Sequence, residues 1–477
     1  MRIYLITVIL PAVYLLAIPG VAPAVDEVKY TLSDCIALTM KENRTIRNAY
    51  LSRVSQKYDL RVAEDKFTPK LVVTTSTQIA GGDSSQGSVP NNSTTGLTAT
   101  INELLPTGAA ISAGPGVGTG TTEHAGTSSN YGWNITLSQP LLKGAWMEVN
   151  TASVKTARLN DQSYILSLKN TIMSTLNSVI TTYRSYVQAL KSLEISRQSL
   201  KRSRDLVETN RELIAAGRMA AFEIVQSEAS LASNELNLLT SENNLDAARL
   251  ALLKAIDTDK NTRLLPIPQT DIPAVPYTFD EAMKLALANR PDYQQSLLSL
   301  EIAKINLMTS KNSTLWDLSL NGSYSGTNSR GGAGGTLDTS NWSAGLKLTA
   351  PFWDLTIDQS YISADVALKQ QQNSLQQQRD NIEIEVRDAL RTAEINLRQI
   401  KLASQARSLS EQKVEIEVEK LKAGRSTNFQ MVSYQNDLVT AQNSELSAII
   451  TYLNALTNLD TTLGITLDRL GIALQER

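Results

Sequence analysis

Two long stretches of the chain contain no proline and a single glycine each. The first runs from Ala145 to Ile256 and is interrupted at Ala216-Gly217-Arg218, and the second runs from Asp354 to Leu463 and is interrupted at Ala423-Gly424-Arg425. Because proline and glycine disfavour helix interiors, both stretches predict very long helices that reverse direction at the glycine. The same phrase recurs at the same place in both stretches, so the chain is predicted to be a duplication.

Apolar residues mark one face of each predicted helix. Before the first turn glycine they are spaced by three or four, as at Ile165, Leu168 and Ile172, which is typical of an amphipathic helix. A helix from Ala145 to Gly217 would be about 100 Å long, more than three times the roughly 30 Å hydrocarbon core of a bilayer. After the glycines the spacing becomes seven, which indicates coiled-coil packing, at Ile224, Leu231, Leu238, Leu245 and Leu252 and at Val432, Val439, Leu446 and Leu453.

Each copy opens with a similar segment. Tyr30–Leu38 is similar to Tyr277–Leu285, and a short helix followed by a longer one is predicted in both copies. Ser33 and Asp280 can each accept hydrogen bonds from free backbone N–H groups at the helix start. The Pro-rich segment between the copies is predicted to be a linker.

Two regions of the chain have the residues of β-strands and loops. Leu318 to Tyr324 alternates apolar and polar residues, Leu71 to Gln78 is rich in Val and Thr, and each strand region is followed by a Gly- and Ser-rich stretch. This pattern is a weak signature of membrane β-barrel strands, and a soluble hairpin would give the same pattern. The regions end at Pro140 and Pro351, where the chain is predicted to leave the strands for the long helices.

The first β region is longer than the second. It contains an additional pair of strand-like segments joined by Pro106-Thr107-Gly108. We expect two main barrel strands in each copy, and the additional hairpin either adds two further strands or forms an outer loop.

The amino terminus predicts export from the cytoplasm. Residues 1–24 contain a basic start, an apolar run and Ala22-Pro23-Ala24, which together indicate a secretory signal peptide, with an uncleaved anchor as the alternative. No later segment is a long uncharged apolar run.

The composition excludes several functions. A net charge of −2 leaves no basic footprint for nucleic acid. The single histidine, His124, and the single cysteine, Cys35, cannot form a metal-ligand cluster, a disulfide or a catalytic triad. Cys35 follows Asp34, which does not fit a lipidation site, so a buried helical cysteine is expected. We therefore expect no catalytic, metal or cofactor site, and no enzyme.

The predicted organisation has two structural repeats, 28–256 and 277–465, joined by a linker at 257–276 and followed by a short tail at 466–477. The first repeat contains helices at 32–66, a β region at 67–140, a long helix at 145–216 and a returning helix at 220–256. The second contains helices at 280–312, a β region at 313–352, a long helix at 355–423 and a returning helix at 427–463.

This order, with the phrase Leu137–Gly144 and the two Ala-Gly-Arg turns, resembles the TolC-like outer-membrane efflux proteins over residues 28–465. The resemblance implies a mainly α fold with a membrane β-barrel portion, in which long helical hairpins form a periplasmic α-barrel. It implies a homotrimer in the lipid of the outer membrane of a Gram-negative-type bacterium, with four strands per protomer in a twelve-stranded barrel. It also implies a periplasmic adaptor (membrane fusion) protein and an inner-membrane pump of the RND or ABC type as partners.

The resemblance further implies a gate and a partner contact at the hairpin tips. Gate residues lie six and nine positions after the turn glycine, which places Glu223 and Gln226 in the first copy and Gln430 and Ser433 in the second. Of these four positions Glu223 alone carries an acid, so an acidic ring in the second copy is in doubt. Glu223 could equally be a carboxylate favoured at a helix N-terminus.

The basic residues after the turn glycines, Arg218 and Arg425, either cap a helix or contact the adaptor, beside the turn residues Gly217 and Gly424. The function expected from this resemblance is a passive exit duct for efflux or type I secretion. The alternative is a periplasmic coiled-coil adaptor or structural protein without a pore of its own. The pump selects the substrate in such systems, so the duct is not expected to encode it.

Overall fold

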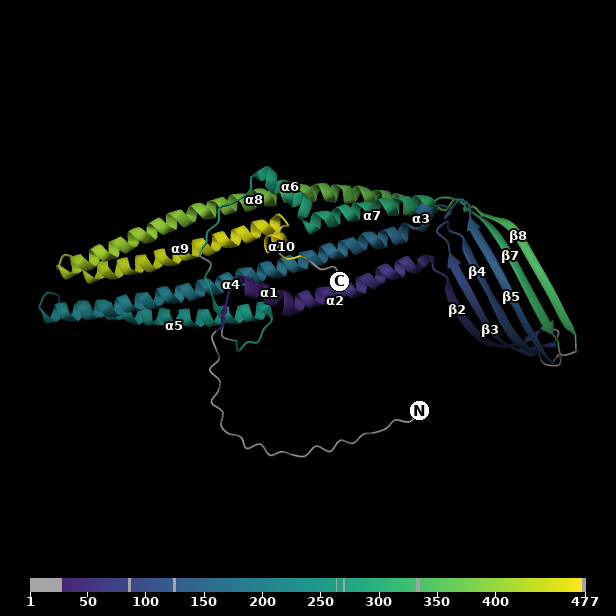
Figure 1. The fold of residues 1–477 in the computed structure, drawn as a ribbon, viewed down its shortest axis with the longest axis horizontal. Helices are drawn as coiled ribbons and strands as arrows, with labels where there is room; N and C mark the ends of the chain where they lie inside the picture. Colours follow the sequence, from purple (N-terminus) through teal and green to yellow (C-terminus); the bar gives the residue numbers. More distant parts are fainter. Residues whose placement is uncertain are drawn as a thin grey trace, which may run out of the picture.

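The computed structural model describes residues 28–84, 87–122, 126–262, 264–268, 271–331 and 335–473. The predicted signal peptide and His124 lie outside these residues. The molecule is elongated, with a curved sheet at one end and the tips of two helical hairpins at the other (Figure 1). No helix in the described part of the chain is long and apolar enough to cross a membrane.

The first copy contains four strands among its helices. Its elements are α1 (Leu32–Glu42), α2 (Arg44–Glu64), the 3-10 turn η1 (Asp65–Phe67), β2 (Lys70–Ser84), β3 (Gly87–Leu104), β4 (Ala110–Thr122), β5 (Gly126–Pro140), α3 (Met147–Asn150), α4 (Ala152–Ala215) and α5 (Glu223–Ile256). The second copy contains α6 (Phe279–Asn289), α7 (Pro291–Ser313), β7 (Asp317–Arg330), β8 (Thr336–Thr349), α8 (Leu355–Lys422), α9 (Asn428–Thr462) and α10 (Thr466–Arg469). A short parallel pair, β1 (Val28–Tyr30) with β6 (Leu264–Pro266), joins the start of the chain to the linker.

The duplication extends to how the first helix of each copy begins. Thr31 forms a capping box with Asp34 on α1, and Thr278 forms the same box with Glu281 on α6. The predicted caps Ser33 and Asp280 lie instead inside the first turn of each helix. The hydrogen bonds that Thr31 donates lower the pKa of Asp34, because they stabilise its ionised carboxylate.

The first long helix is shorter than residues 145–216, the range predicted for it. The chain makes the separate turn α3 before α4 begins at Ala152. Gly144 has a φ of +81°, and Nδ2 of Asn150 donates to its carbonyl at 2.7 Å and to that of Trp146 at 3.1 Å. Helix therefore begins at Met147, after the turn at Gly144, and α3 is separated from α4 by Thr151 alone.

The helices pack around buried apolar residues. Cys35 is fully buried with residues of α4 and α5, and burial raises the pKa of its thiol to about 11. The hydroxyl of Tyr183, on α4, donates to the carbonyl of Ile267 at 2.8 Å and lies 3.0 Å from that of Tyr30. This side chain ties the long helix to the β1–β6 pair. The expectation of a buried helical cysteine agrees with this packing.

All strands of the β regions form one antiparallel sheet in the order β2-β3-β4-β5-β7-β8. The two copies meet where β5 pairs with β7. The sheet has six strands, so the expectation of four strands per protomer, two in each copy, is wrong. The additional hairpin pairs within the sheet and is not an outer loop. The reason is a tight turn at Gly108, which has a φ of +87° and donates its N–H to the carbonyl of Leu105 at 2.8 Å.

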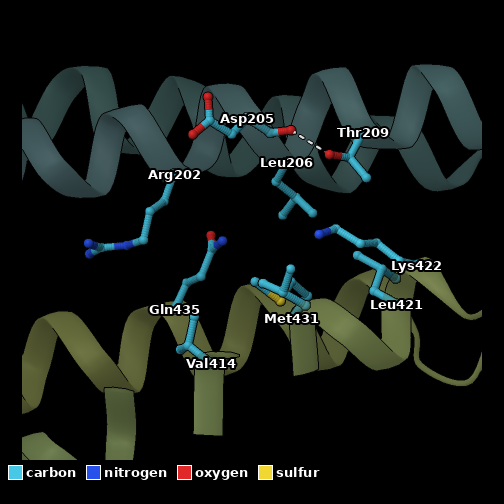
Figure 2. Close-up of a pocket in the computed structure, with 10 residues that line it drawn as sticks. Arg202, Asp205, Leu206, Thr209, Val414, Leu421, Lys422, Met431 and Gln435 are labelled. Atoms are coloured by element: carbon cyan, nitrogen blue, oxygen red, sulfur yellow. Dashed lines mark hydrogen bonds between the residues drawn. The ribbon is translucent and has the colours of Figure 1, made fainter. Parts of the chain in front are cut away.

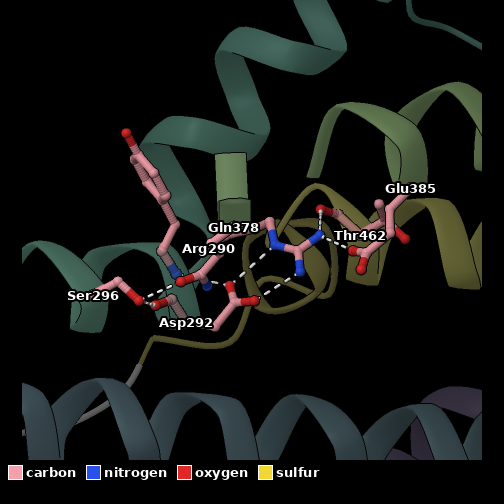
Figure 3. A network of polar contacts seen from close by, with 7 residues as sticks. Arg290, Asp292, Ser296, Gln378, Glu385 and Thr462 are labelled. Atoms are coloured by element: carbon pink, nitrogen blue, oxygen red, sulfur yellow. Dashed lines mark hydrogen bonds and ion pairs between the residues drawn. The ribbon is translucent and has the colours of Figure 1, made fainter. Parts of the chain in front are cut away.

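A polar network secures the break between α6 and α7 (Figure 3). The guanidinium of Arg290 donates to Asp292 at 2.7 Å, to Glu385 of α8, and at 3.5 Å to the carbonyl of Thr462 at the end of α9. Its side chain is 13% exposed. Burial raises the pKa of Asp292, but its hydrogen bonds with Arg290 and the guanidinium charge outweigh burial and leave the pKa below its usual value. Arg290 therefore joins three helices of the second copy.

Replacing Arg290 with methionine is expected to lower the free energy of unfolding by about 2 kcal/mol at pH 7, because it removes the hydrogen bonds from the guanidinium to two carboxylates and a carbonyl. The difference from wild type should shrink below about pH 4, because Asp292 has a lowered pKa and contributes its stability only while it is ionised. Thermal unfolding followed by circular dichroism would measure both effects. Arg391→Met is the control, since Arg391 and Asp388 are 67% and 62% exposed, and equal losses in the two variants would contradict the prediction.

Candidate functional site: the hairpin tips

The two long hairpins reverse through the same backbone turn. Gly217 and Gly424 both have a φ of +70°. At the first tip the N–H groups of Gly217 and Arg218 donate to the carbonyls of Ile214 and Leu213 at 2.9 and 2.8 Å. The second tip repeats both bonds, from Gly424 to Leu421 at 3.0 Å and from Arg425 to Lys420 at 2.8 Å. This pair of bonds is a Schellman motif, which requires a left-handed residue and therefore favours glycine.

The side chains of the two tip arginines differ in their contacts. Nη2 of Arg218 donates to the carbonyl of Lys422 at 2.9 Å, so the first tip is tied to the second. Arg425 is exposed on the surface of its tip. The duplicated turns therefore present different side-chain arrangements.

The four predicted gate positions lie in the first turns of the returning helices. Glu223 is the first residue of α5, a position where the helix dipole favours a carboxylate, and Gln226 follows one turn later. Both are half-buried. Gln430 is exposed on α9 and bonded to Tyr434, whereas Ser433 is half-buried. The single protomer places the two sets on neighbouring hairpins, and their role in gating stays a prediction.

A pair of buried asparagines joins the hairpins next to these positions. Asn428, the first residue of α9, and Asn210, on α4, are both fully buried. Nδ2 of Asn210 donates to Oδ1 of Asn428 at 3.0 Å, and Nδ2 of Asn428 donates to the carbonyl of Glu223 at 2.9 Å. The sequence patterns described above predict neither residue. One signal was present, because Asn210 interrupts an apolar stripe between Leu206 and Leu213.

A cavity of about 300 Å³ lies between the two hairpins a short way above the tips. Leu206 of α4 faces Met431 and Leu421 across it, while Asp205 and Lys422 lie at its rim (Figure 2). Arg202 lines the same cavity, and its Nε and Nη2 atoms are buried without a hydrogen-bond partner in the described residues. Burial lowers the pKa of Arg202, and the nearby charge of Glu411 opposes that shift.

The exits from the sheet lie where the sheet joins the helices, far from the tips (Figure 1). Pro140 is the last residue of β5, and the next N–H, of Leu141, still donates to the carbonyl of Leu318 at 2.7 Å. Pro351 follows β8 and precedes Asp354, whose carboxylate caps α8 by accepting from the N–H of Thr356 at 3.0 Å. Within the described residues no group of three or more His, Cys, Asp or Glu side chains is placed to hold a metal ion.

The fold is shared with known outer-membrane channels. The chain is similar to the CmeC channel of Campylobacter jejuni, with a TM-score of 0.69 and 16% identity over 91% of this chain and 86% of that one. It is similar to VceC of Vibrio cholerae, with a TM-score of 0.68 and 14% identity over 91% of this chain and 96% of that one. It is also similar to the open state of MtrE of Neisseria gonorrhoeae, with a TM-score of 0.66 and 17% identity over 91% of this chain and 89% of that one. No curated protein matches the chain in sequence.

The sequence itself matches the family described as Outer membrane efflux protein. The match covers residues 36–258 and 282–465, one segment in each copy. The family and the similar structures are channels rather than enzymes. The two hairpins, the shared sheet and this match agree, and the chain belongs to the outer membrane efflux protein family.

Proposed function

We propose that this outer-membrane channel-tunnel is a passive exit duct that works as a homotrimer with a periplasmic adaptor and an inner-membrane pump. One observation carries the proposal: a six-stranded sheet and the tips of two long helical hairpins lie at opposite ends of one elongated molecule (Figure 1). The sheet suits the outer membrane, and hairpins of 64 and 68 residues in their first helices extend about 100 Å from it. We propose no catalytic step, since the pump supplies the work.

The adaptor contact belongs at the cavity between the hairpins. An apolar floor beside a rim of Asp205 and Lys422 suits the tip of a helical hairpin with its own apolar residues and charges. The unpaired donor atoms of Arg202 would gain a partner if the adaptor supplied a carbonyl or carboxylate there. These features support docking of an adaptor hairpin near the tips.

Fractionation and deletion test the duct itself. The protein is expected in the outer-membrane fraction, and deletion of its gene is expected to sensitise the bacterium to compounds that the partner pump exports. Recovery from the soluble periplasmic fraction would contradict the duct and favour a periplasmic coiled-coil protein without a pore.

Reversing the charge of Lys422 tests the adaptor contact. Lys422→Glu is expected to lower co-purification of the adaptor by about tenfold, which corresponds to about 1.4 kcal/mol. The matched control is Lys401→Glu, because Lys401 is also exposed on α8 and lies about 30 Å along the helix from Lys422. Equal co-purification of the two variants would place the contact elsewhere.

The gate proposal is tested at Glu223. If the carboxylates of three copies narrow the periplasmic entrance, Glu223→Ala should weaken block of the single-channel current by multivalent cations in planar bilayers. Glu242→Ala, which removes an exposed carboxylate about 28 Å further along α5, should leave that block unchanged. Identical block in wild type and Glu223→Ala would remove this residue from the pore.

A further inference from the structure

Through the middle of all six strands, one face of the sheet is apolar and the other is polar, while Glu103, Arg330 and Asp338 lie on the apolar side only near the strand ends. One row of paired residues crosses the sheet from Leu71 through Ile101, Ala113, Ile135 and Tyr324 to Trp342. A second row, on the opposite face, runs from Thr74 through Thr98, Gly116, Gly132 and Thr327 to Thr339. Successive residues of a strand point to opposite faces, so the alternation holds through β3 and β4 as well as through the other four strands.

No segment of the chain that the structure describes covers the apolar face. Trp342 and Ile79 are 78% and 77% exposed, and Leu346 is 69% exposed. Apolar side chains of this size in a continuous band indicate contact with lipid. On β5 and β7 the rings of Trp133 and Tyr324 pack with their centroids 4.8 Å apart, which keeps the band continuous where the two copies meet.

The two edges of the sheet require strand partners. In the described residues β2 pairs only with β3, and β8 only with β7. An open edge within lipid leaves backbone N–H and C=O groups unsatisfied, each at a cost of several kcal/mol. Because six antiparallel strands alternate in direction, β2 and β8 run in opposite directions. The β8 edge of one copy can therefore pair antiparallel with the β2 edge of the next, and the strands are 14 and 15 residues long.

We propose that three copies close one eighteen-stranded barrel in which β3 and β4 are full members of the wall. The trimer is taken from the proposed function, and the strand number follows from the six-stranded sheet. Barrel diameter grows roughly linearly with strand number, so this barrel is about 1.5 times as wide as a twelve-stranded one. Sixteen to eighteen strands are the size at which porins leave an aqueous channel.

The side chains of the polar face line this pore and determine which solutes can pass through it. Glycine, serine, threonine and asparagine dominate it, and glycines occupy four alternating positions of β4 from Gly114 to Gly120. Among polar-face side chains that the structure describes, the charged ones are Lys70, Asp317 and Lys347, and all lie near the strand ends next to the helices. Among the described side chains, the wall of the outer half is therefore uncharged, and its glycines make it thin. The pore passes bulky solutes of either charge, and selection by size falls to the hairpin tips.

Adjacent cysteines on β3 test whether this strand lies in the barrel wall. Thr98→Cys faces the lumen and is expected to react in intact cells with a thiol reagent that cannot cross membranes. Leu97→Cys faces lipid and is expected to react at least tenfold more slowly, and both should react in the denatured protein. Wild type is the blank, because its one thiol, at Cys35, is fully buried. Equal labelling of Thr98→Cys and Leu97→Cys in cells would overturn the proposal.

Imaging of the wild-type trimer in lipid nanodiscs gives the strand number directly. Eighteen strands are expected, and a wall of twelve strands with β3 and β4 outside it would overturn the proposal. Neither measurement depends on export. If the trimer has eighteen strands but deletion of the gene leaves efflux unchanged, the proposed function alone is wrong. If the trimer has twelve strands and deletion of the gene abolishes efflux, this inference alone is wrong.

Discussion

Alanine in place of Gly114 is expected to lower the yield of folded protein in the outer membrane more than tenfold. An added Cβ at Gly114 would lie 2.0 Å from the carbonyl oxygen of Ala99 and 2.8 Å from Cα of Thr100. Both atoms belong to the backbone of β3, so no side-chain rotation relieves the overlap, and the strands must move apart. Overpacking of this kind costs about 1–3 kcal/mol, and here it also breaks pairing in the middle of the sheet.

The sequence explains why β3 and β4 approach so closely at this point. The pairing is interrupted between Thr98↔Gly116 and Ile101↔Ala113, where Gly114 and Pro115 follow one another. Proline has no N–H to donate, and glycine has no side chain to hold the strands apart. The yield of heat-resistant, folded protein in washed outer membranes, measured on gels without boiling, tests the prediction.

Gly345 provides the control for this substitution. It lies on the same polar face of the sheet, on β8, and an added Cβ there would meet no atom within 4 Å in the single chain. Gly345→Ala should fold with a yield close to that of wild type. If Gly114→Ala folds equally well, then β3 and β4 do not pair in the membrane as they do in this structure.

The contrast between the turns and the additional hairpin shows what the sequence could predict. A glycine flanked by long helical periodicity has one stable local role, so Gly217 and Gly424 could be interpreted from their neighbours. The segment from residue 95 to 117 has no comparable local signal, because alternation looks alike in a barrel strand and in an outer loop. Its place became evident only from cross-strand pairs such as Leu97↔Val117 and Val117↔Tyr131, which align its apolar residues with the rest of the face.

The asparagine pair at the tips shows a different limit. Asn210 and Asn428 are separated by 218 residues, and each is buried because one hairpin packs on the other. A single sequence carries no direct signal for such a contact. Their separation also makes the pair informative about function, because it reports whether the two hairpins are together.

Replacing Asn428 with leucine is expected to loosen the contact between the two tips. The channel should then spend a larger fraction of time in its high-conductance state. The substitution removes the two hydrogen bonds that the Asn428 side chain makes to the other hairpin, and it leaves the buried amide of Asn210 and the carbonyl of Glu223 without that partner. Each of the two unsatisfied groups costs the packed tips about 1–3 kcal/mol, so the substitution favours separated tips by about 2–6 kcal/mol. A shift of that size raises the population of a minor open state about 30-fold or more.

Single-channel recordings in planar bilayers measure this population as the fraction of time spent in the high-conductance state. Asn436→Leu is the matched control, because Asn436 lies on the same helix, two turns further along, with an exposed side chain. Neither variant alters Arg218 or Lys422, whose hydrogen bond also joins the two tips. An unchanged open fraction in Asn428→Leu would show that the tips are held by contacts between copies rather than by this pair. A rise in Asn428→Leu that Asn436→Leu does not share would make Asn428 the residue that couples the two unlike turns.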